Sequence, residues 1–270
     1  MTAVLTIARA SVTEHFRRKL ILFFLVILLL VTAGLLYLTV NDSLAADLTT
    51  ATIGLATAAS LGLLPLIAAL SAVAVSMNNI GRPFSDGEAM LIMSRPLTRW
   101  QYALGRLSAS FAVIFGLCAV SALLMQGVRL FDVGGLDSGL WGHWATTAFN
   151  LSILAAITTL VSSLVNAPVL AAFISYFIYS LSGVVATLYL LVSNSRVGGM
   201  AGALITAAWY LTPKTLVSPL LMREVESAGA AAALPGSILI PSTAGRVLWA
   251  VAYMAIMILL TFLVVERKDL

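Results

Sequence analysis

Long uncharged runs alternate with short charged segments along the chain. Long apolar runs without Asp, Glu, Lys or Arg reach or exceed the length of about 20 residues that a helix needs to cross the hydrocarbon core of a bilayer. The longest, Ser138–Ser195, exceeds one span, and Pro168 divides it because proline removes a backbone donor and disfavours helix in the residue before it. The pattern predicts six transmembrane helices, near residues 20–40, 50–78, 104–128, 144–165, 168–192 and 246–265.

The composition fits a chain that is solvated mainly by lipid. Of the 270 residues, 61% are apolar and 10% are charged, and the mean hydropathy is +1.05. Soluble domains carry about 25% charged residues, so this chain has too few charges to cover a water-facing surface. The sequence therefore predicts an all-α polytopic membrane protein, with residues 1–270 forming a single transmembrane domain.

The first 19 residues have an amphipathic helical pattern. Arg9, Glu14 and Arg17 lie away from an apolar face. Such a segment is typical of a helix in the membrane interface, and we expect an elbow helix over residues 3–19. The alternative is a basic flank that only sets the topology. The apolar face consists of Leu5, Ala8, Val12 and Phe16.

Basic residues are divided unequally between the two sides of the predicted bundle. Ten of the 15 Lys and Arg residues lie before the first span, between the second and third spans, or after the sixth. Cytoplasmic loops are enriched in Lys and Arg, so we expect both termini and the loop Ile80–Arg106 in the cytoplasm. On the other side, Thr212-Pro213 and Ser218-Pro219 look like helix starts and predict re-entrant or short helices over about 197–228.

The loop Ile80–Arg106 contains two capping-box patterns. Ser85–Glu88 predicts a helix over about 85–95 that stops before Pro96. Thr98–Gln101 predicts the start of a second helix that continues into the third span. Apolar side chains rimmed by charge on the first helix favour a docking surface for another protein. The alternative is a solvated or lipid-lying connection.

Several kinds of chemistry are missing from the sequence. No charged residue falls in the middle of a predicted span, which argues against an ion-coupled transporter. The two histidines and the single Cys118 form no catalytic or metal-binding pattern, and no basic patch indicates nucleic-acid binding. No Gly-Lys dipeptide occurs, so the chain has no P-loop. We expect no enzyme, metal or cofactor here, and any ATP must be bound by a partner.

The cytoplasmic loop ends in a recognisable motif. It consists of Met93-Ser94-Arg95-Pro96-Leu97-Thr98-Arg99 and then Leu104-Gly105-Arg106. The motif resembles that of type-2 ABC exporter permeases, which show Leu-x-Ser-Arg-Pro-x-x-Arg followed by Leu-Gly-Lys, and Arg106 keeps the charge of the usual Lys. The basic elbow, six spans, Pro-marked outer segment and basic C-terminus extend the resemblance along the chain. The layout is similar to permeases of nitrous-oxide-reductase maturation and of antibiotic or lipid export.

The resemblance implies an export subunit in the prokaryotic plasma (inner) membrane, driven by two copies of a separate ATP-binding subunit that hold ATP and Mg. A second permease, identical or related, would complete the transporter, with lipids and a periplasmic or membrane accessory protein as further partners. The helix near 85–95 would be a coupling helix, and Asn166 and Pro168 would make a second contact. The expected interface residues of the loop are Ser85, Asp86, Glu88, Met90, Leu91, Ser94, Arg95, Pro96 and Arg99.

Polar residues in spans two and five are candidates for a substrate path. Asn78 and Asn79 end span two. The candidates on span five are Ser175, Tyr176, Tyr179 and Ser182. The alternative for all six is ordinary helix packing, and no residue selects a substrate class.

Two alternatives to the ABC permease remain open. A secondary transporter or channel would move its substrate without ATP. A structural subunit of a membrane complex would hold a stable partner without transport. The loop motif favours the permease.

Leu28 lies in the middle of the first predicted span, and Thr98 lies in the loop. A charge at the centre of a spanning helix costs about 3 kcal/mol on insertion, whereas a loop charge stays in water. We expect Leu28→Asp to lower the membrane-integrated fraction, measured by alkaline extraction, far more than Thr98→Asp does. Equal integration of the two variants would contradict the first span.

Overall fold

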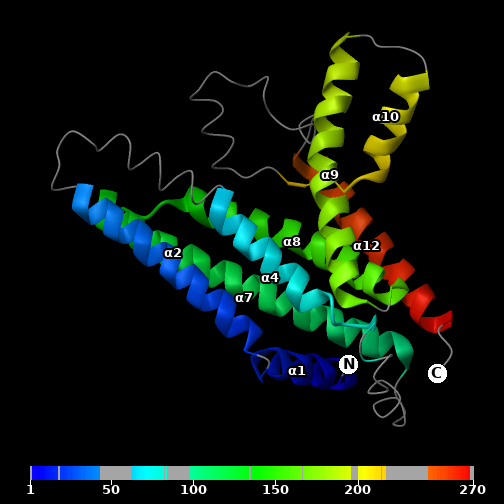
Figure 1. Cartoon of the computed structure of the whole chain (residues 1–270), viewed down its shortest axis with the longest axis horizontal. Coiled ribbons are helices and arrows are strands. Elements are labelled where there is room, and N and C mark those ends of the chain that lie inside the picture. The colour runs from blue at the N-terminus through cyan, green and yellow to red at the C-terminus, as the bar shows by residue number, and fades with distance from the viewer. Residues whose placement is uncertain are drawn as a thin grey trace.

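The described part of the chain is all-α, as the sequence predicts (Figure 1). The computed structural model describes residues 2–17, 19–42, 62–81, 83, 98–133, 135–165, 167–195, 200–213, 215–216 and 243–267. Its helices are α1 (Thr2–Arg17), α2 (Leu20–Asp42), α4 (Leu64–Ser76), α7 (Arg99–Val133), α8 (Ser138–Leu164), α9 (Pro168–Ser195), α10 (Met200–Leu211) and α12 (Thr243–Arg267).

Within the described residues, four helices are long and apolar enough to cross a membrane, which indicates a multi-pass helical membrane protein. Shorter apolar stretches lie in α2 and α4, at the positions of the first and second predicted spans, and in α10. Residues 43–61, which include the start of the second predicted span, lie outside the described residues. The four long stretches are Arg99–Leu130, Ser138–Leu164, Pro168–Val185 and Val247–Arg267.

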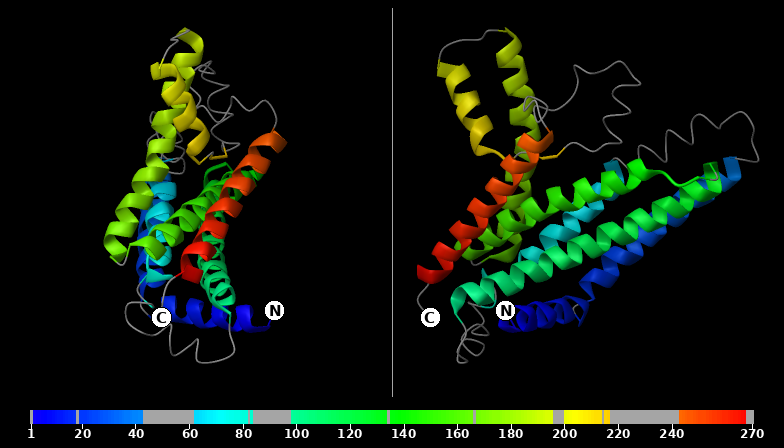
Figure 2. Two further views of the ribbon diagram at one scale, coloured as in Figure 1. Left: turned by 90° about the vertical axis from the view of Figure 1, so that its right-hand side faces the viewer. Right: turned by 180° about the vertical axis from the view of Figure 1, so that it is seen from behind.

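The helical hairpin of α7 and α8 forms the centre of the bundle. α7 packs against α8 and also contacts α1, α2, α4 and α12 (Figures 1 and 2). The apolar stretch of α8 is 72% buried, whereas that of α12 is only 11% buried, so α8 is central and α12 is peripheral. Small side chains such as Ala148, Ser152 and Ala155 line α8 where it is buried, and small residues let helices approach closely.

α9 and α10 project together from one end of the bundle (Figure 1). They are joined through the stacked rings of Tyr189 and Trp209, whose centroids lie 4.5 Å apart. The 12 residues of α10 are about 18 Å long, which is shorter than the roughly 30 Å hydrocarbon core. The predicted outer segment 197–228 therefore contains one short helix in its described part, and residues 217–228 lie outside that part.

Lys19 makes the sharp turn between α1 and α2. Its φ of 56° lies in the left-handed region, which costs energy for a residue with a side chain. Its backbone N–H donates to the carbonyl oxygen of Phe16 at 3.0 Å. α1 lies across the end of the bundle and α2 leaves it at an angle (Figure 2), so α1 and this turn occupy the segment in which an elbow is expected.

α1 turns one face to the bundle and another away from it. Ser11 and His15 are buried, and the side chain of Ile7 lies against Gly105 of α7. Leu5 and Phe16, from the predicted apolar face, are 72% and 49% exposed. These two side chains therefore point away from α7, where a membrane interface would cover them.

α7 begins at Arg99, directly after Thr98, so the helix start predicted by the capping box Thr98–Gln101 is confirmed. The backbone N–H of Thr98 donates to Gln101 Oε1 at 3.3 Å, which is one of the two hydrogen bonds of a capping box. The 35 residues of α7 extend about 52 Å, so this helix is longer than the hydrocarbon core requires. Its extra turns carry the contacts with α1 and α12 that are described below.

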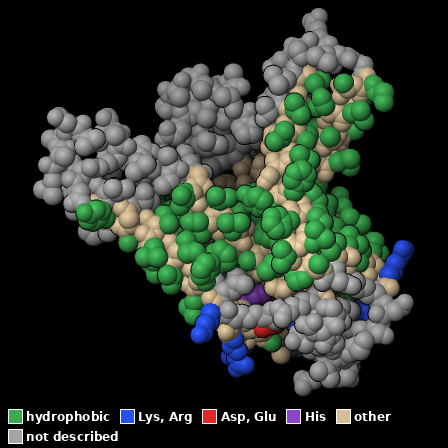
Figure 3. Space-filling view, in the orientation of Figure 1, with side chains coloured by type: hydrophobic (Ala, Val, Ile, Leu, Met, Phe, Trp, Pro, Cys, Tyr) green, Lys and Arg blue, Asp and Glu red, His purple; other side chains and the backbone are tan. Residues whose placement is uncertain are grey.

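Lys and Arg gather at the end of the bundle where α1 lies, here called the α1 end. In Figure 3, hydrophobic side chains cover the helices, and the basic side chains in view lie along this end and near the end of α12. Among the described basic side chains, only Arg129 lies at the far end of α7. Those at the α1 end are Arg9, Arg17, Lys19, Arg99, Arg106 and Arg267.

Gly105 marks the closest approach of α1 and α7. A Cβ there would lie 2.7 Å from the Cβ and Cγ2 of Ile7, whereas a Cβ at Gly116 on the same helix would meet nothing within 4 Å. We expect Gly105→Ala to destabilise the fold by about 1–3 kcal/mol through overpacking. Gly116→Ala should be neutral or stabilising by about 0.5–1 kcal/mol, because glycine weakens a helix. Thermal unfolding in detergent measures both, and equal midpoints would refute the close contact.

Candidate functional site

Arg99 fastens the start of α7 to the end of α12. Its Nη1 donates to the carbonyl oxygens of Glu266 at 2.8 Å and Val265 at 3.4 Å. A cation is favoured beside the free carbonyl groups at a helix C-terminus. Arg99 was expected at the interface with a partner, and in the described structure its guanidinium binds within the chain.

The remaining predicted interface residues are mostly outside the described part. Of the predicted interface residues in the loop, only Arg99 is described. Asn166 is likewise outside, and Pro168 is the first residue of α9. The loop residues outside the described part are Ser85, Asp86, Glu88, Met90, Leu91, Ser94, Arg95 and Pro96.

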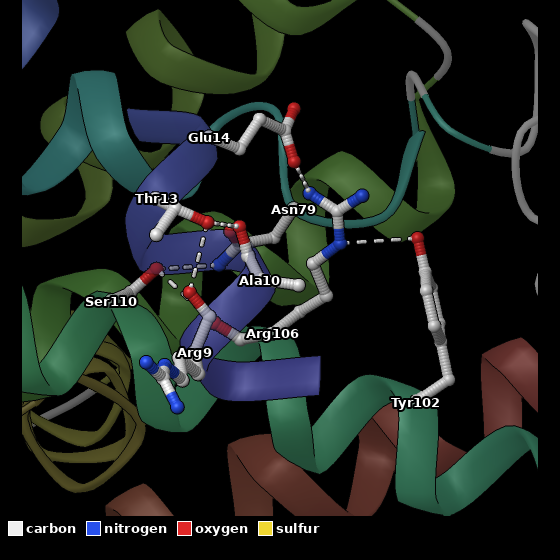
Figure 4. A network of polar contacts seen from close by, with 8 residues as sticks. All are labelled: Arg9, Ala10, Thr13, Glu14, Asn79, Tyr102, Arg106 and Ser110. Carbon is white, nitrogen blue, oxygen red and sulfur yellow. Dashed lines mark hydrogen bonds and ion pairs between the residues drawn. The ribbon is translucent and has the colours of Figure 1, made fainter. Parts of the chain in front are cut away.

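Arg106 joins α7 to α1 through a largely buried ion pair (Figure 4). Its Nη1 lies 2.8 Å from Glu14 Oε2, and the two side chains are 6% and 29% exposed. Its Nε donates to the hydroxyl of Tyr102 at 3.2 Å, and its guanidinium carbon lies 5.5 Å from the centroid of the Tyr102 ring. A buried guanidinium requires a compensating charge, so Glu14 holds α1 in place on α7.

A neutral polar cluster joins the end of α4 to α7 and α8. Asn79 is fully buried, and its Nδ2 donates to Ser110 Oγ at 2.8 Å and to Thr159 Oγ1 at 3.2 Å. Figure 4 shows Asn79 and Ser110 beside the Arg106 contacts. At Gly81, a Cβ would collide with the carbonyl oxygen of Ser162 on α8. The chain leaving α4 is therefore held tightly before the loop begins.

A cavity of about 390 Å³ lies between α4, α8 and α9. The α4 side is apolar and includes Pro65, Leu66 and Ala69. The α8 side includes Thr147 and Asn150. Such a volume lies within the range of small-molecule sites. The residues contributed by α9 and the following segment are Tyr176, Tyr179, Ser180, Ser182, Gly183 and Thr215.

Three of the six predicted path residues line this cavity, namely Tyr176, Tyr179 and Ser182. Ser175 is fully buried, and its hydroxyl donates to the carbonyl oxygen of Ala171 at 2.6 Å. Asn79 belongs to the polar cluster at the α1 end, and Asn78 lies beside it in the turn after α4. The structure therefore groups the α9 residues at the cavity and places the two asparagines elsewhere.

Asn150 clamps the segment after α10 against α8. Its Nδ2 donates to the carbonyl oxygen of Leu216 at 2.9 Å, and its Oδ1 accepts from the N–H of Leu216 at 2.7 Å. Asn150 and Thr215 both line the cavity, so this clamp closes part of the cavity wall. Our sequence reasoning missed Asn150, although a single amide inside an apolar span is itself a signal of function.

The chain has no match among protein families or among the curated proteins with which it was compared. Within the described residues, no group of three or more His, Cys, Asp or Glu side chains could hold a metal ion. Function must therefore be argued from the motif, the fastened loop ends and the cavity.

Asn150→Asp keeps an acceptor for the Leu216 N–H but places a carboxylate against the Leu216 carbonyl oxygen. The contact is partly buried, and leaving a buried polar group unsatisfied costs at most about 1–3 kcal/mol, so the segment should open more often. We expect faster maleimide labelling of Thr215→Cys in this background, measured against the low background of Cys118, which is buried.

Thr146→Ala is the matched control for this change, because among the described residues the Thr146 hydroxyl bonds to the Gly142 and His143 carbonyl groups of its own helix and not to Leu216. It should leave the labelling rate of Thr215→Cys unaltered. Equal rates in the Asn150→Asp and Thr146→Ala backgrounds would argue against the clamp.

Proposed function

We propose that the protein is the permease subunit of an ATP-driven ABC exporter, with a separate ATP-binding subunit docked on the loop between α4 and α7. In this proposal α2 and α4 contribute two spans beside the four long helices, which makes six. The observation that carries the proposal is that both ends of the motif-bearing loop are fastened to other helices. A docked subunit can transmit force to the membrane helices only if both ends of the loop are held rigidly against them.

The two ends of the loop make different kinds of contact. At the start of the loop, Asn79 and Gly81 hold the chain against α7 and α8. At the end of the loop, where α7 begins, Arg99 binds the end of α12 and Arg106 binds α1. Packed helices resist local deformation, so a displacement of the loop would move these helices as rigid bodies.

α4 provides a route from the loop to the cavity. Pro65 and Ala69, near one end of α4, line the cavity. Ser76, at the other end, is followed within three residues by Asn79 in the polar cluster. A rigid helix that reaches both places would carry a movement of the loop to the cavity wall, where cargo is expected.

The distribution of charge supports a cytoplasmic α1 end. Six of the seven described Lys and Arg side chains lie there, and only Arg129 lies at the opposite end. Cytoplasmic ends of spanning helices are the ones enriched in basic residues. The loop would then face the compartment that holds ATP, and the clamp at Asn150 would lie toward the outer side of a prokaryotic plasma membrane.

A charge change on the loop should uncouple the protein from its ATP-binding partner. We expect Leu91→Asp and Glu88→Arg to lower ATP-driven transport and partner-associated ATPase activity at least several-fold while membrane integration stays normal. Leu136→Asp is the control, because Leu136 is an exposed leucine, 76% accessible, at the far end of the α7–α8 hairpin. Full transport by both loop variants at normal expression would remove the docking assignment.

The partner itself can be sought by affinity purification of the chain in mild detergent, with mass spectrometry and an ATPase assay. A stoichiometric partner with a P-loop would support the permease. Recovery of the chain alone, with flux that follows an ion gradient in liposomes, would support a secondary transporter. A stable partner without ATPase or transport would support a structural subunit.

A further inference from the structure

The cavity between α4, α8 and α9 has one apolar wall and one hydroxyl-bearing wall. Pro65, Leu66 and Ala69 supply the apolar wall from α4. Tyr179 and Ser180 on α9 face the same space, together with Tyr176. Within the described part of the chain, the hydroxyls of these three α9 residues have no hydrogen-bond partner, so they are free to bind a ligand.

Two further polar residues of the cavity are already engaged. The Ser182 hydroxyl donates to the carbonyl oxygen of Tyr179 at 2.6 Å, and both amide atoms of Asn150 are paired with Leu216. The hydrogen-bonding capacity of the described wall therefore lies in the α9 hydroxyls and in those of Thr147 on α8 and Thr215. A ligand would place its polar group against this hydroxyl-bearing side and its apolar part against α4.

None of the described lining residues is Asp, Glu, Lys, Arg or His. An ion buried in such surroundings would lose its hydration without gaining a counter-charge, which is strongly unfavourable. Burying a neutral molecule costs much less free energy, because the hydroxyl groups of the wall can replace its hydrogen bonds to water. The described part of the cavity wall therefore favours a neutral molecule over a cation or an anion.

We propose that this cavity binds an uncharged amphipathic molecule, with an apolar ring system or chain and at least one hydroxyl-type group. The volume of about 390 Å³ limits the bound part to the size of a small drug-like molecule. That this molecule is exported cargo rests on the proposed function, whereas its binding to the cavity does not.

The test uses the full-length chain in nanodiscs, without nucleotide or partner, and a cysteine at the cavity. Gly183→Cys is the reporter, because Gly183 lines the cavity and a Cβ there would meet nothing within 4 Å. Cys118 is buried and contributes little background. Maleimide labelling is followed with three probes that share one ring system: anthracenemethanol, anthracenecarboxylate and anthracenemethylammonium. Ala112→Cys, at an exposed position of α7 away from the cavity, reports non-specific partition of the probes into lipid.

We expect anthracenemethanol to slow labelling of Gly183→Cys at least several-fold, neither ion to do so, and labelling of Ala112→Cys to be unaffected. Adding Thr147→Asp should reverse the preference toward anthracenemethylammonium, because Thr147 lines the cavity. Equal protection by the ions, no protection by the alcohol, or equal protection at both cysteines would overturn the proposal. The labelling assay needs no ATP, so a negative result does not contradict the proposed ATP-driven function. Conversely, failure to recover an ATPase partner does not contradict a positive binding result.

Discussion

Arg106 lies on α7 with its guanidinium almost wholly removed from solvent, and the carboxylate of Glu14 compensates its charge at 2.8 Å. Without that carboxylate the fold would contain an uncompensated buried cation, which is far more costly than the pair itself. α1 must therefore stay against α7, and Gly105 lets the two helices approach closely enough to maintain the contact. The left-handed turn at Lys19 then directs α2 along the bundle.

The two polar centres of the molecule differ in chemistry, and that difference fits their places. The charged pair lies at the α1 end, where α7 extends past the length that a hydrocarbon core requires. Neutral hydroxyl and amide groups make the contacts at the fully buried Asn79 beside the pair and line the cavity between α4, α8 and α9. Low dielectric strengthens a satisfied neutral hydrogen bond but penalises an isolated charge. In agreement with this difference in cost, no charged residue lies in the middle of any predicted span.

Local patterns predicted the helices better than they predicted the site. Pro168 does separate α8 from α9, and Thr98 does precede the first residue of α7. Tyr176 and Tyr179, three residues apart on one helix face, do share the cavity. Ser175 is adjacent to Tyr176 in sequence but faces the packed side of α9, because successive helical residues point in different directions. The sequence carries no comparable signal for the cavity residues on α4 and α8, because their place at the cavity depends on which helices pack against α9.

The sequence by itself determined the all-α class, the membrane-crossing character and most helix boundaries, because hydropathy, proline and capping act over a few neighbouring residues. It also located the motif-bearing loop and the uneven distribution of basic residues. Only the tertiary structure decided that Glu14 meets Arg106, that Arg99 binds α12 rather than solvent, and that Asn150 holds Leu216. These pairs join residues separated by 92, 167 and 66 positions. In a lipid-facing bundle every helix has an apolar surface, so hydropathy does not specify its neighbours, and close packing with a few polar contacts must do so.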